Sequence, residues 1–378
     1  MFREREEQAA QDRTRFRAFA EQHVAPLAAE IDEQERFPIE TIPKLAERGF
    51  FGLPVAKEYG GGGTGFIAYC RCIEELSRVC ASTGVIVSSH VSLGCEPILK
   101  FGTEKQKHAH LPPMAHGNKL AAFALTEPNA GSDVSGLQTT AIRDGDAYRL
   151  NGEKIFITNA GEAAVYIVFA ATNPSLKNKG ISAFIVDAET PGFTVGEKHR
   201  KMGIRGCSNA KLHFNDCIVP AENLLGNVGD GFSIAMQTLD AGRISIGAQA
   251  VGIAQGAFDA TVEYVRQRIQ FGKPIAAFQN TRFRIADMKT RIDSSRLLVE
   301  RAAERKDAGL PYRIEAAMAK LSASETAVAV TAQCFQLHGG YGYTRDFPIE
   351  RMFRDAKITE IYEGTSEVQK MVISSAIV

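Results

Sequence analysis

Residues 354–367 read Arg-Asp-Ala-Lys-Ile-Thr-Glu-Ile-Tyr-Glu-Gly-Thr-Ser-Glu, a helical pattern that breaks at Gly364 and then resumes. One interpretation is a helix that ends at the glycine, followed by a second helix that Thr365 caps. The other is a working base, because Glu363 lies between an aromatic ring and a glycine that allows close approach of a ligand. Burial beside the ring of Tyr362 would raise the pKa of this carboxyl group. Taken alone, the stretch favours the helix end and cap. The choice between the two interpretations therefore depends on the motifs in the rest of the chain.

The composition limits the classes of protein. The chain has 378 residues, of which 44% are hydrophobic, so it can bury a large core in two or three domains or in one composite unit. Lys plus Arg and Asp plus Glu both total 44, and this zero net charge argues against a nucleic-acid or membrane-surface protein. The sequence has no apolar run of 18 residues, so we expect no transmembrane helix.

The cysteines and the N-terminal residues bear on the compartment. Seven scattered cysteines are typical of reduced thiols in an intracellular compartment, and no Cys or His pair has metal-site spacing. We interpret His108 and His110 as residues of an exposed loop. Residues 1–7 predict neither a secretory signal nor a transit peptide, because they lack an apolar stretch and mix Glu with Arg.

The hydrophobic pattern changes twice along the chain, from helical to alternating and back to helical. Residues 2–120 have helical periodicity, with a short helix expected at Ile42–Gly49 and a buried helix pair at Phe66–Cys95. From about Leu120 the pattern alternates, and hairpin turns are expected at Asp144-Gly145-Asp146 and at Asn151-Gly152. Strands are predicted at 147–150, 164–171, 181–186, 193–195 and 210–214, which indicates a β-barrel or sandwich.

After Gly231 the chain is helical again. Residues 232–270 contain no proline and predict one very long helix, or two that are nearly collinear, ended by Phe271-Gly272-Lys273-Pro274. Helices at about 281–307 and 314–337 have bundle patterning, and His338–Tyr343 is too rich in glycine for a helix. We therefore expect an α+β multi-domain chain with an N-terminal helical domain (1–120), a middle β-domain (121–225) and a C-terminal four-helix bundle (226–378).

Four motifs stand out, each of which also has a simpler interpretation. In Phe123–Asp133 a strand is expected to end at Thr126, before a loop that could hold a phosphate or the polar edge of a flavin, or could simply be capped by Ser132 and Asp133. In Lys154–Gly161, Phe156 and Thr158 share a face if the segment is a strand, and could contact a planar cofactor or belong to the core.

The other two motifs lie in the helical C-terminal part. In Arg268–Ile275 a positive side chain at a helix end could meet a phosphate, or could interact only with the helix terminus. In Gln336–Gly340 the backbone could approach a ligand closely, or the glycines could simply end the helix.

Taken in this order, and ending in Tyr362-Glu363-Gly364-Thr365, the motifs resemble those of the acyl-CoA dehydrogenase family over essentially the whole chain. The resemblance is strongest to the short-chain, butyryl-CoA branch, through residues 239–244, 316–321 and 358–367. It implies non-covalently bound FAD and a homotetramer that is a dimer of dimers. The residues that match FAD contacts of the family are Phe123, Leu125, Thr126, Gly131, Ser132, Phe156, Thr158, Arg268, Phe271, Gln279, Gln336, Gly339, Gly340, Thr365 and Glu367.

The resemblance also implies the chemistry. Glu363 matches the catalytic base, which takes the α-proton of an acyl-CoA thioester while the β-hydrogen leaves as hydride to flavin N5, giving a trans-2-enoyl-CoA. In the family, the backbone N–H of the base and a ribityl hydroxyl of FAD bind the thioester carbonyl, and an electron-transfer flavoprotein receives the electrons. The residues that match substrate contacts are Ser132, Asp240, Arg243, Tyr362 and Gly364.

This sequence departs from the family pattern in minor ways. Phe156 stands where many relatives carry Trp, and Ala160 where a second glycine is common. Some relatives place the base on the long helix, beside the arginine that corresponds to Arg243, but here that neighbour is Gly242. Glu363 is therefore the candidate base.

Several alternatives stay open. They are an acyl-CoA oxidase, a non-catalytic flavin- or CoA-binding relative, and a dehydrogenase of branched or cyclic acyl-CoA. Straight C4 is the first expectation for the acyl group, with no nucleic acid, membrane or metal involved. The expected compartment is the cytoplasm of a bacterium, or the mitochondrial matrix for a processed form.

Overall fold

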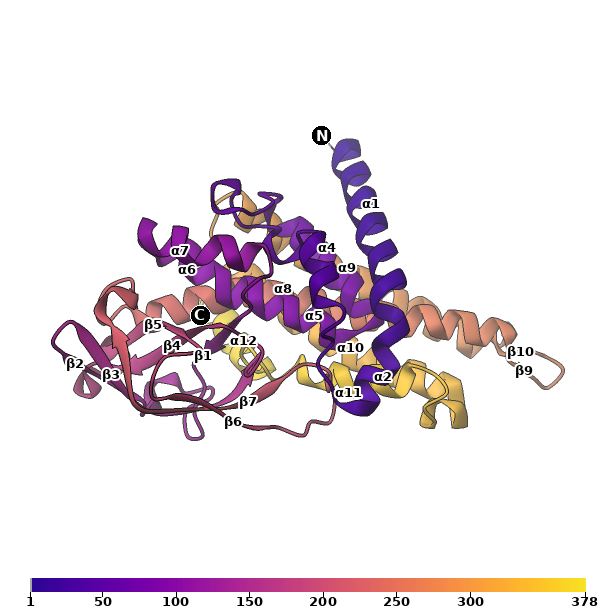
Figure 1. Cartoon of the computed structure of the whole chain (residues 1–378). Helices are drawn as coiled ribbons and strands as arrows, with labels where there is room; N and C mark the ends of the chain where they lie inside the picture. The colour runs from indigo at the N-terminus through magenta and orange to yellow at the C-terminus, as the bar shows by residue number, and fades with distance from the viewer. Residues whose placement is uncertain (1) are drawn as a thin grey trace.

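The computed structural model describes residues 2–378, and its N-terminal third is helical as expected (Figure 1). Gly49 ends the predicted short helix in a left-handed conformation, with φ of 69°. A π-helical segment, η5 (Ser89–Cys95), continues the buried α4–α5 pair. The helices of this part are α1 (Phe2–Phe19), α2 (Ala28–Gln34), α3 (Ile42–Glu47), α4 (Gly65–Val79), α5 (Ala81–Ser88), α6 (Glu96–Phe101) and α7 (Glu104–Ala115).

The middle part is one mixed sheet of eight strands within residues 2–378. The strands pair in the order β6-β7-β3-β2-β4-β5-β8, and β1 pairs in parallel with β4. Their bounds are β1 (Ala121–Ala124), β2 (Thr140–Asp144), β3 (Ala147–Thr158), β4 (Val165–Ala171), β5 (Ile181–Asp187), β6 (Phe193–Lys198), β7 (Asn209–Pro220) and β8 (Leu224–Leu225).

The sheet curls around its own core, because rings from non-adjacent strands meet. Tyr148 of β3 contacts Phe184 of β5 with centroids 5.0 Å apart, and Tyr166 of β4 contacts Phe193 of β6 at 4.7 Å. Strand β4 is buried on both faces. Because successive side chains of a strand point to opposite faces, alternate residues of β4 belong to two different hydrophobic cores. Tyr166 and Val168 face the curled interior, whereas Ile167 and Phe169 face a core shared with α6, α7 and α8. The predicted β-domain is confirmed.

Two sequence predictions about the strands are wrong. Asn151-Gly152 is not a hairpin turn, because β3 runs through it with an irregularity between Leu150 and Gly152, where Gly152 has φ of 144°. The first strand ends at Ala124 rather than Thr126. The turn at Asp144-Gly145-Asp146 does join β2 to β3 as predicted.

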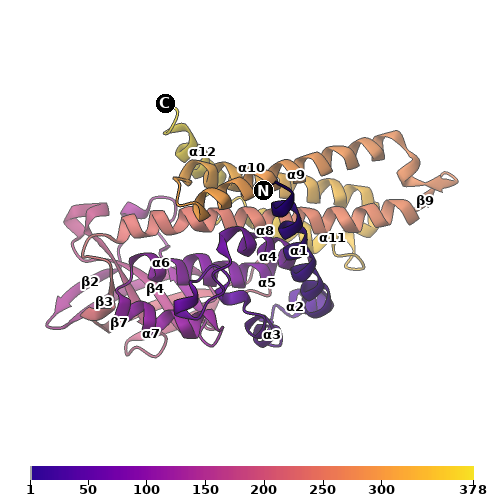
Figure 2. The ribbon, with the colours of Figure 1, turned by 90° about the horizontal axis from the view of Figure 1, so that it is seen from above.

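The C-terminal part is a bundle of long helices (Figure 2). The predicted long helix is a single helix, α8 (Gly231–Gln267), which ends three residues before the predicted end at Gln270 because Arg268 is extended. A hairpin of β9 (Ile269–Gln270) and β10 (Lys273–Pro274) leads into α9 (Gln279–Asp307) and α10 (Arg313–His338). Residues Gly339–Tyr343, expected to be non-helical, form a short 3-10 helix before α11 (Ile349–Ile358) and α12 (Ser366–Ser374).

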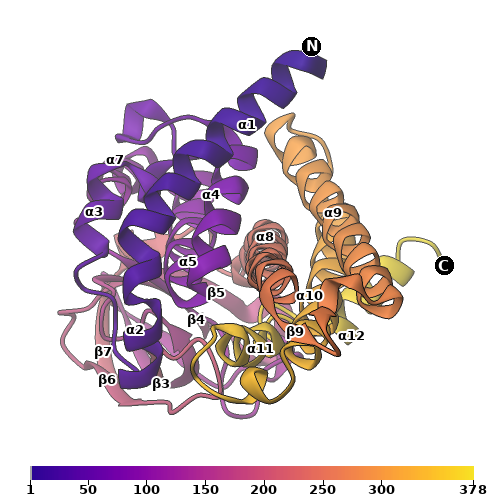
Figure 3. The same cartoon turned by 90° about the vertical axis from the view of Figure 1, so that its right-hand side faces the viewer.

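Helix α8 is the central element of the molecule. Figure 3 shows it between α4 and α5 on one side and α9 and α10 on the other. Gly252 and Gly256, one turn apart, let α8 approach α4, because a Cβ at either position would overlap the carbonyl group of Glu74 or Arg78. The N-terminal helices and the bundle therefore share one hydrophobic core. Within residues 2–378, no helix combines the length and the apolar character needed to cross a membrane.

Candidate active site

The loop between α11 and α12 has an unusual backbone. Glu363 has φ of 52° and Gly364 has φ of 94°, so two consecutive residues are left-handed. This conformation is easy for glycine but strained for glutamate. Thr365 then caps α12, since its side chain accepts a hydrogen bond from Val368 N at 3.3 Å. The predicted cap at Thr365 is present, but the predicted helix end at Gly364 is wrong, because α11 already ends at Ile358 and Thr359–Gly364 form turns before α12.

The Glu363 carboxylate lies against α8. A Cβ at Gly242 would overlap Glu363 Oε2 and would lie 3.0 Å from both Glu363 Cδ and Leu93 Cδ2. Oε2 is buried and has no hydrogen-bond partner among the described residues. Burial raises the pKa of Glu363 to about 8, against the opposing effect of Lys320 and Arg243. A poorly solvated carboxylate with a free oxygen is suited to accept a proton.

Two predicted substrate residues lie one turn apart on α8, beside this carboxylate. Arg243 donates to Asp240 Oδ1 at 2.6 Å, and both side chains are largely buried. Burial lowers the pKa of Arg243 and raises that of Asp240. Arg243 Nε is buried without a partner in the described part of the chain, which leaves a donor for a ligand.

Side chains that the sequence analysis missed hold the Glu363 loop. Lys320 of α10 and Gln369 of α12 both donate to the Gly364 carbonyl at 2.8 Å. Tyr362 donates its hydroxyl to Gln249, whose amide donates to Ala81 O at 3.0 Å. The available signal for Lys320 was a single lysine inside the small apolar stretch Ala316–Leu321.

A second group of predicted residues gathers where β1 ends beside the end of β3. Ile155 N donates to Thr126 O at 2.9 Å, which places Phe123–Thr126 next to Phe156–Thr158. Phe156 is 61% exposed, with its ring against His199. The assumed strand alternation fails here, because Phe156 has φ of 62° in a bulge between Lys154 and Ile157. Gly131 and Ser132 are exposed on the loop after β1.

A buried ion pair fixes that loop. Glu127 accepts from Lys154 Nζ at 2.7 Å, from Gln138 N at 2.6 Å and from Thr139 N at 3.0 Å. Lys154 also donates to Leu125 O at 3.1 Å. Burial lowers the pKa of Lys154 to about 8, which Glu127 opposes. The loop after β1 is therefore rigid at its base and open at Gly131.

Segments α5 and η5 connect the second group to the Glu363 loop. Asn159, just after β3, donates to Ile86 O at 3.2 Å, and Gln249 of α8 binds the same short helix at Ala81. In η5, His90 accepts from Ala121 N at 3.0 Å, while Ser92 contacts Ser245 of α8 at 3.2 Å. The β1–β3 corner and Glu363 thus face the same buried segments. A π-helical segment is often found at functional sites.

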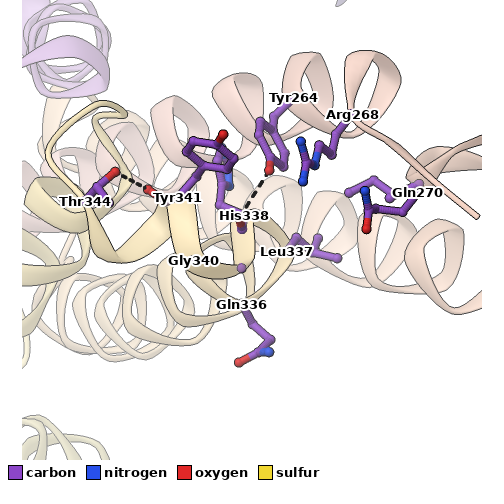
Figure 4. A pocket seen from close by; sticks show the side chains of 11 residues that line it. Tyr264, Arg268, Gln270, Gln336, Leu337, His338, Gly340, Tyr341 and Thr344 are labelled. Atoms are coloured by element: carbon purple, nitrogen blue, oxygen red, sulfur yellow. Dashed lines mark hydrogen bonds between the residues drawn. The ribbon is translucent and has the colours of Figure 1, made fainter.

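Four further predicted residues lie near the C-terminal end of α8 and line a cavity of about 520 Å³ (Figure 4). Arg268, Gln336, Gly339 and Gly340 border this cavity, and an added Cβ on either glycine would meet nothing within 4 Å among the described residues. The Arg268 guanidinium lies 5.4 Å from the ring centroid of Tyr341.

Three residues matched to FAD contacts lie apart from the Glu363 site, the β1–β3 corner and the cavity near Arg268 within one chain. Phe271, at the β9–β10 tip, is 92% exposed, and Gln279 begins α9 as an exposed residue. Glu367 is exposed in the first turn of α12. Among residues 2–378, no group of three or more His, Cys, Asp or Glu side chains could hold a metal ion.

Comparison with known families accounts for nearly the whole chain. The acyl-CoA dehydrogenase N-terminal domain matches residues 5–118, the middle domain residues 122–217 and the C-terminal domain residues 229–378. The chain belongs to the acyl-CoA dehydrogenase family. The resemblance seen in the sequence is thereby confirmed.

Relatives of this acyl-CoA dehydrogenase agree in sequence and structure. A short-chain specific acyl-CoA dehydrogenase of Clostridium acetobutylicum is 53% identical over 97% of this chain and 96% of its own. The structure of butyryl-CoA dehydrogenase from Megasphaera elsdenii matches with a TM-score of 0.96 and 48% identity, covering 98% and 97% of the two chains. A structure described as the electron transferring flavoprotein of Acidaminococcus fermentans matches with a TM-score of 0.97 and 49% identity, covering 98% and 97%.

Proposed function

We propose that this acyl-CoA dehydrogenase uses FAD to remove one hydrogen from each of Cα and Cβ of a short-chain acyl-CoA thioester, with Glu363 as the base. The observation that carries the proposal is the buried Glu363 carboxylate against Gly242, with its free Oε2 and its raised pKa. The family membership and the short-chain relative support the reaction and the substrate class.

The residues of the loop account for the proton transfer. The α-proton of a thioester is weakly acidic, so its removal needs a base whose pKa is near the working pH and a donor for the developing enolate oxygen. Glu363 supplies the base. The strained backbone at Glu363 and Gly364 presents peptide groups in a fixed orientation, and we assign the thioester carbonyl to the Glu363 N–H. Arg243 and Asp240 contribute substrate contacts on α8.

The β1–β3 corner fits a flavin. It combines the exposed aromatic ring of Phe156 and the partly buried ring of Phe123 with the open loop at Gly131 and Ser132, where a Cβ on Gly131 would meet nothing within 4 Å among residues 2–378. Thr158 would hydrogen-bond to the ring edge, and the loop after β1 would hold the pyrophosphate. Bound FAD would supply the two-electron acceptor for the β-hydrogen.

The remaining FAD contacts require a second copy of the chain. Arg268 lies 25 residues after Arg243 along α8, which corresponds to roughly 40 Å along the helix axis. A cofactor whose flavin lies beside Glu363 and Arg243 does not extend to Arg268 in the same subunit, so we infer that Arg268, Gln336 and the Gly339-Gly340 turn serve the partner's site. The exposed Phe271 and Gln279 fit the same interface. We propose a homotetramer built as a dimer of dimers.

For the acyl group we propose straight C4 first, and branched C4 or C5 second. The butyryl-CoA dehydrogenase neighbour supports this order. We propose an electron-transfer flavoprotein as the electron acceptor, supported by the neighbour described as such a protein.

The experiment that tests the proposal compares Glu363→Gln with Glu325→Gln, an exposed carboxylate of α10 that pairs with Lys370. Glu363→Gln should retain FAD and lose at least about a hundredfold in turnover of butyryl-CoA to crotonyl-CoA, because the base is gone. Glu325→Gln should match the wild type. Undiminished turnover in Glu363→Gln would place the base elsewhere.

A further inference from the structure

Lys320 is a fully buried lysine beside the proposed base. It lies on α10, its side chain has 0% exposure, and Nζ donates to the carbonyl oxygen of Gly364 at 2.8 Å. Burying an ammonium group is costly, so its retention here calls for a specific partner. The partner is the carbonyl group of Gly364, the residue after Glu363, whereas Glu363 Oε2 itself has no hydrogen bond among the described residues.

The Gly364 carbonyl is held from two sides. Gln369 of α12 donates to the same oxygen at 2.8 Å, so a charged donor and a neutral donor converge on one acceptor. This carbonyl belongs to the second of the two left-handed residues, Glu363 and Gly364. Such a strained backbone persists only where the surrounding contacts hold it in place. Lys320 and Gln369 both fix the Gly364 carbonyl, but only Lys320 adds a charge.

The charges around Glu363 come from several elements. Arg243 of α8, paired with Asp240, and Lys320 of α10 favour its ionised form, while burial disfavours it. Lys320 itself faces Glu363, Arg243, Glu360 and Glu367, and burial lowers its pKa to about 8. The Lys320 ammonium and the Arg243 guanidinium therefore both act on the base, and Lys320 is the one that also binds the Glu363–Gly364 loop.

We propose that Lys320 is a positioning residue for the reaction: through the Gly364 carbonyl it fixes the left-handed backbone of Glu363 and keeps a buried positive charge next to the loop that carries the base. This inference rests on the proposed function of Glu363. A lysine that only filled space would influence folding without altering the protonation of Glu363.

The test compares Lys320→Met with Gln369→Leu, which removes the neutral donor to the same carbonyl without changing the charge. Both variants should lower kcat, by about ten- to a hundredfold, because each loosens the base. Lys320→Met should also move the acid limb of the kcat/KM profile to higher pH by about one unit or more, whereas Gln369→Leu should leave it in place. Lys320→Gln, which keeps a donor but no charge, should show the same pH shift and serves if the Met variant does not fold.

A second measurement separates this inference from the proposed function. The carboxyl infrared band that is absent in Glu363→Gln reports the protonation of Glu363 without turnover, and its midpoint should rise in Lys320→Met and not in Gln369→Leu. An unchanged midpoint in both Lys320 variants would overturn the role of Lys320 even if butyryl-CoA is oxidised. A shifted midpoint in a protein that oxidises no acyl-CoA would overturn the proposed function and leave the effect of Lys320 on Glu363 standing.

Discussion

The Glu363 carboxylate occupies the space that a side chain at Gly242 would need. A Cβ at position 242 would overlap Oε2 and lie 3.0 Å from Cδ of Glu363. The Glu363 carboxylate therefore fits against α8 only because position 242 has no side chain. This gap allows a carboxylate from the loop after α11 to reach the site.

Gly242→Ala should therefore displace the base. The variant should keep FAD, because an added Cβ at position 242 would meet Glu363 and Leu93, neither of which is among the residues matched to FAD contacts. Its turnover should fall by about a hundredfold, the effect of misplacing a reacting group by about 1 Å. Steady-state kinetics with butyryl-CoA, together with flavin content, checks this.

The double variant Gly242→Glu with Glu363→Gly tests the same relationship in reverse. A carboxylate on α8 would reach the same region, so the double variant should regain part of the activity that Glu363→Gly loses. If Gly242→Ala turns over like the wild type, the carboxylate does not act from this position.

The rate should depend on pH through Glu363. Burial raises the pKa of this group to about 8, and only the deprotonated form accepts the α-proton. Consequently kcat/KM should fall as the pH decreases below about 8 and should level off above it. A profile measured between pH 6 and 10 that stays flat would mean that Glu363 is ionised throughout or is not the base.

The sequence predicted the order of the parts well, because helical and alternating periodicity depend on local burial. The long α8 and the cap at Thr365 followed from uninterrupted apolar spacing and from a Gly-Thr break. The course of β3 did not, because Gly152 and Phe156 take positive φ only where β7 and the loop after β1 impose irregular pairing. Lys320 was missed because its partner is a backbone carbonyl 44 residues away. The domain boundaries at 120 and 225 remain predictions.

The buried pair of Lys154 and Glu127 should be important for stability and for FAD binding. Lys154→Met leaves Glu127 buried without its cation, which costs about 3–5 kcal/mol in the free energy of unfolding. FAD retention should weaken too, because Glu127 fixes the loop after β1. Chemical denaturation and flavin content measure both effects.

The matched control is Lys105→Met, which removes an exposed ion pair with Glu222. That change should cost less than about 1 kcal/mol. Equal effects of the two substitutions would show that the buried pair has no special role in the loop.

Sharing of FAD contacts between subunits predicts complementation. Arg268→Ala should release FAD, and Glu363→Gln should bind FAD without turnover. In a mixed dimer one site combines the intact Glu363 of one chain with the intact Arg268 of the other, so random mixing should restore about a quarter of wild-type activity. The chains are unfolded and refolded together, then assayed without added FAD. If the mixture stays inactive although mixed dimers form, Arg268 acts within its own chain or has no role in FAD binding.

The most direct test of short-chain acyl-CoA oxidation is anaerobic titration of the purified protein with acyl-CoA thioesters from C4 to C16 and with branched C4 and C5 thioesters, followed by flavin absorbance. Short-chain oxidation predicts rapid bleaching by butyryl-CoA and weaker bleaching as the chain lengthens, with each methylene worth about 1–3 kcal/mol. Bleaching by a branched thioester instead would keep the reaction and change the substrate. A bound flavin that no thioester reduces would contradict the assignment as an acyl-CoA dehydrogenase that uses Glu363 as its base.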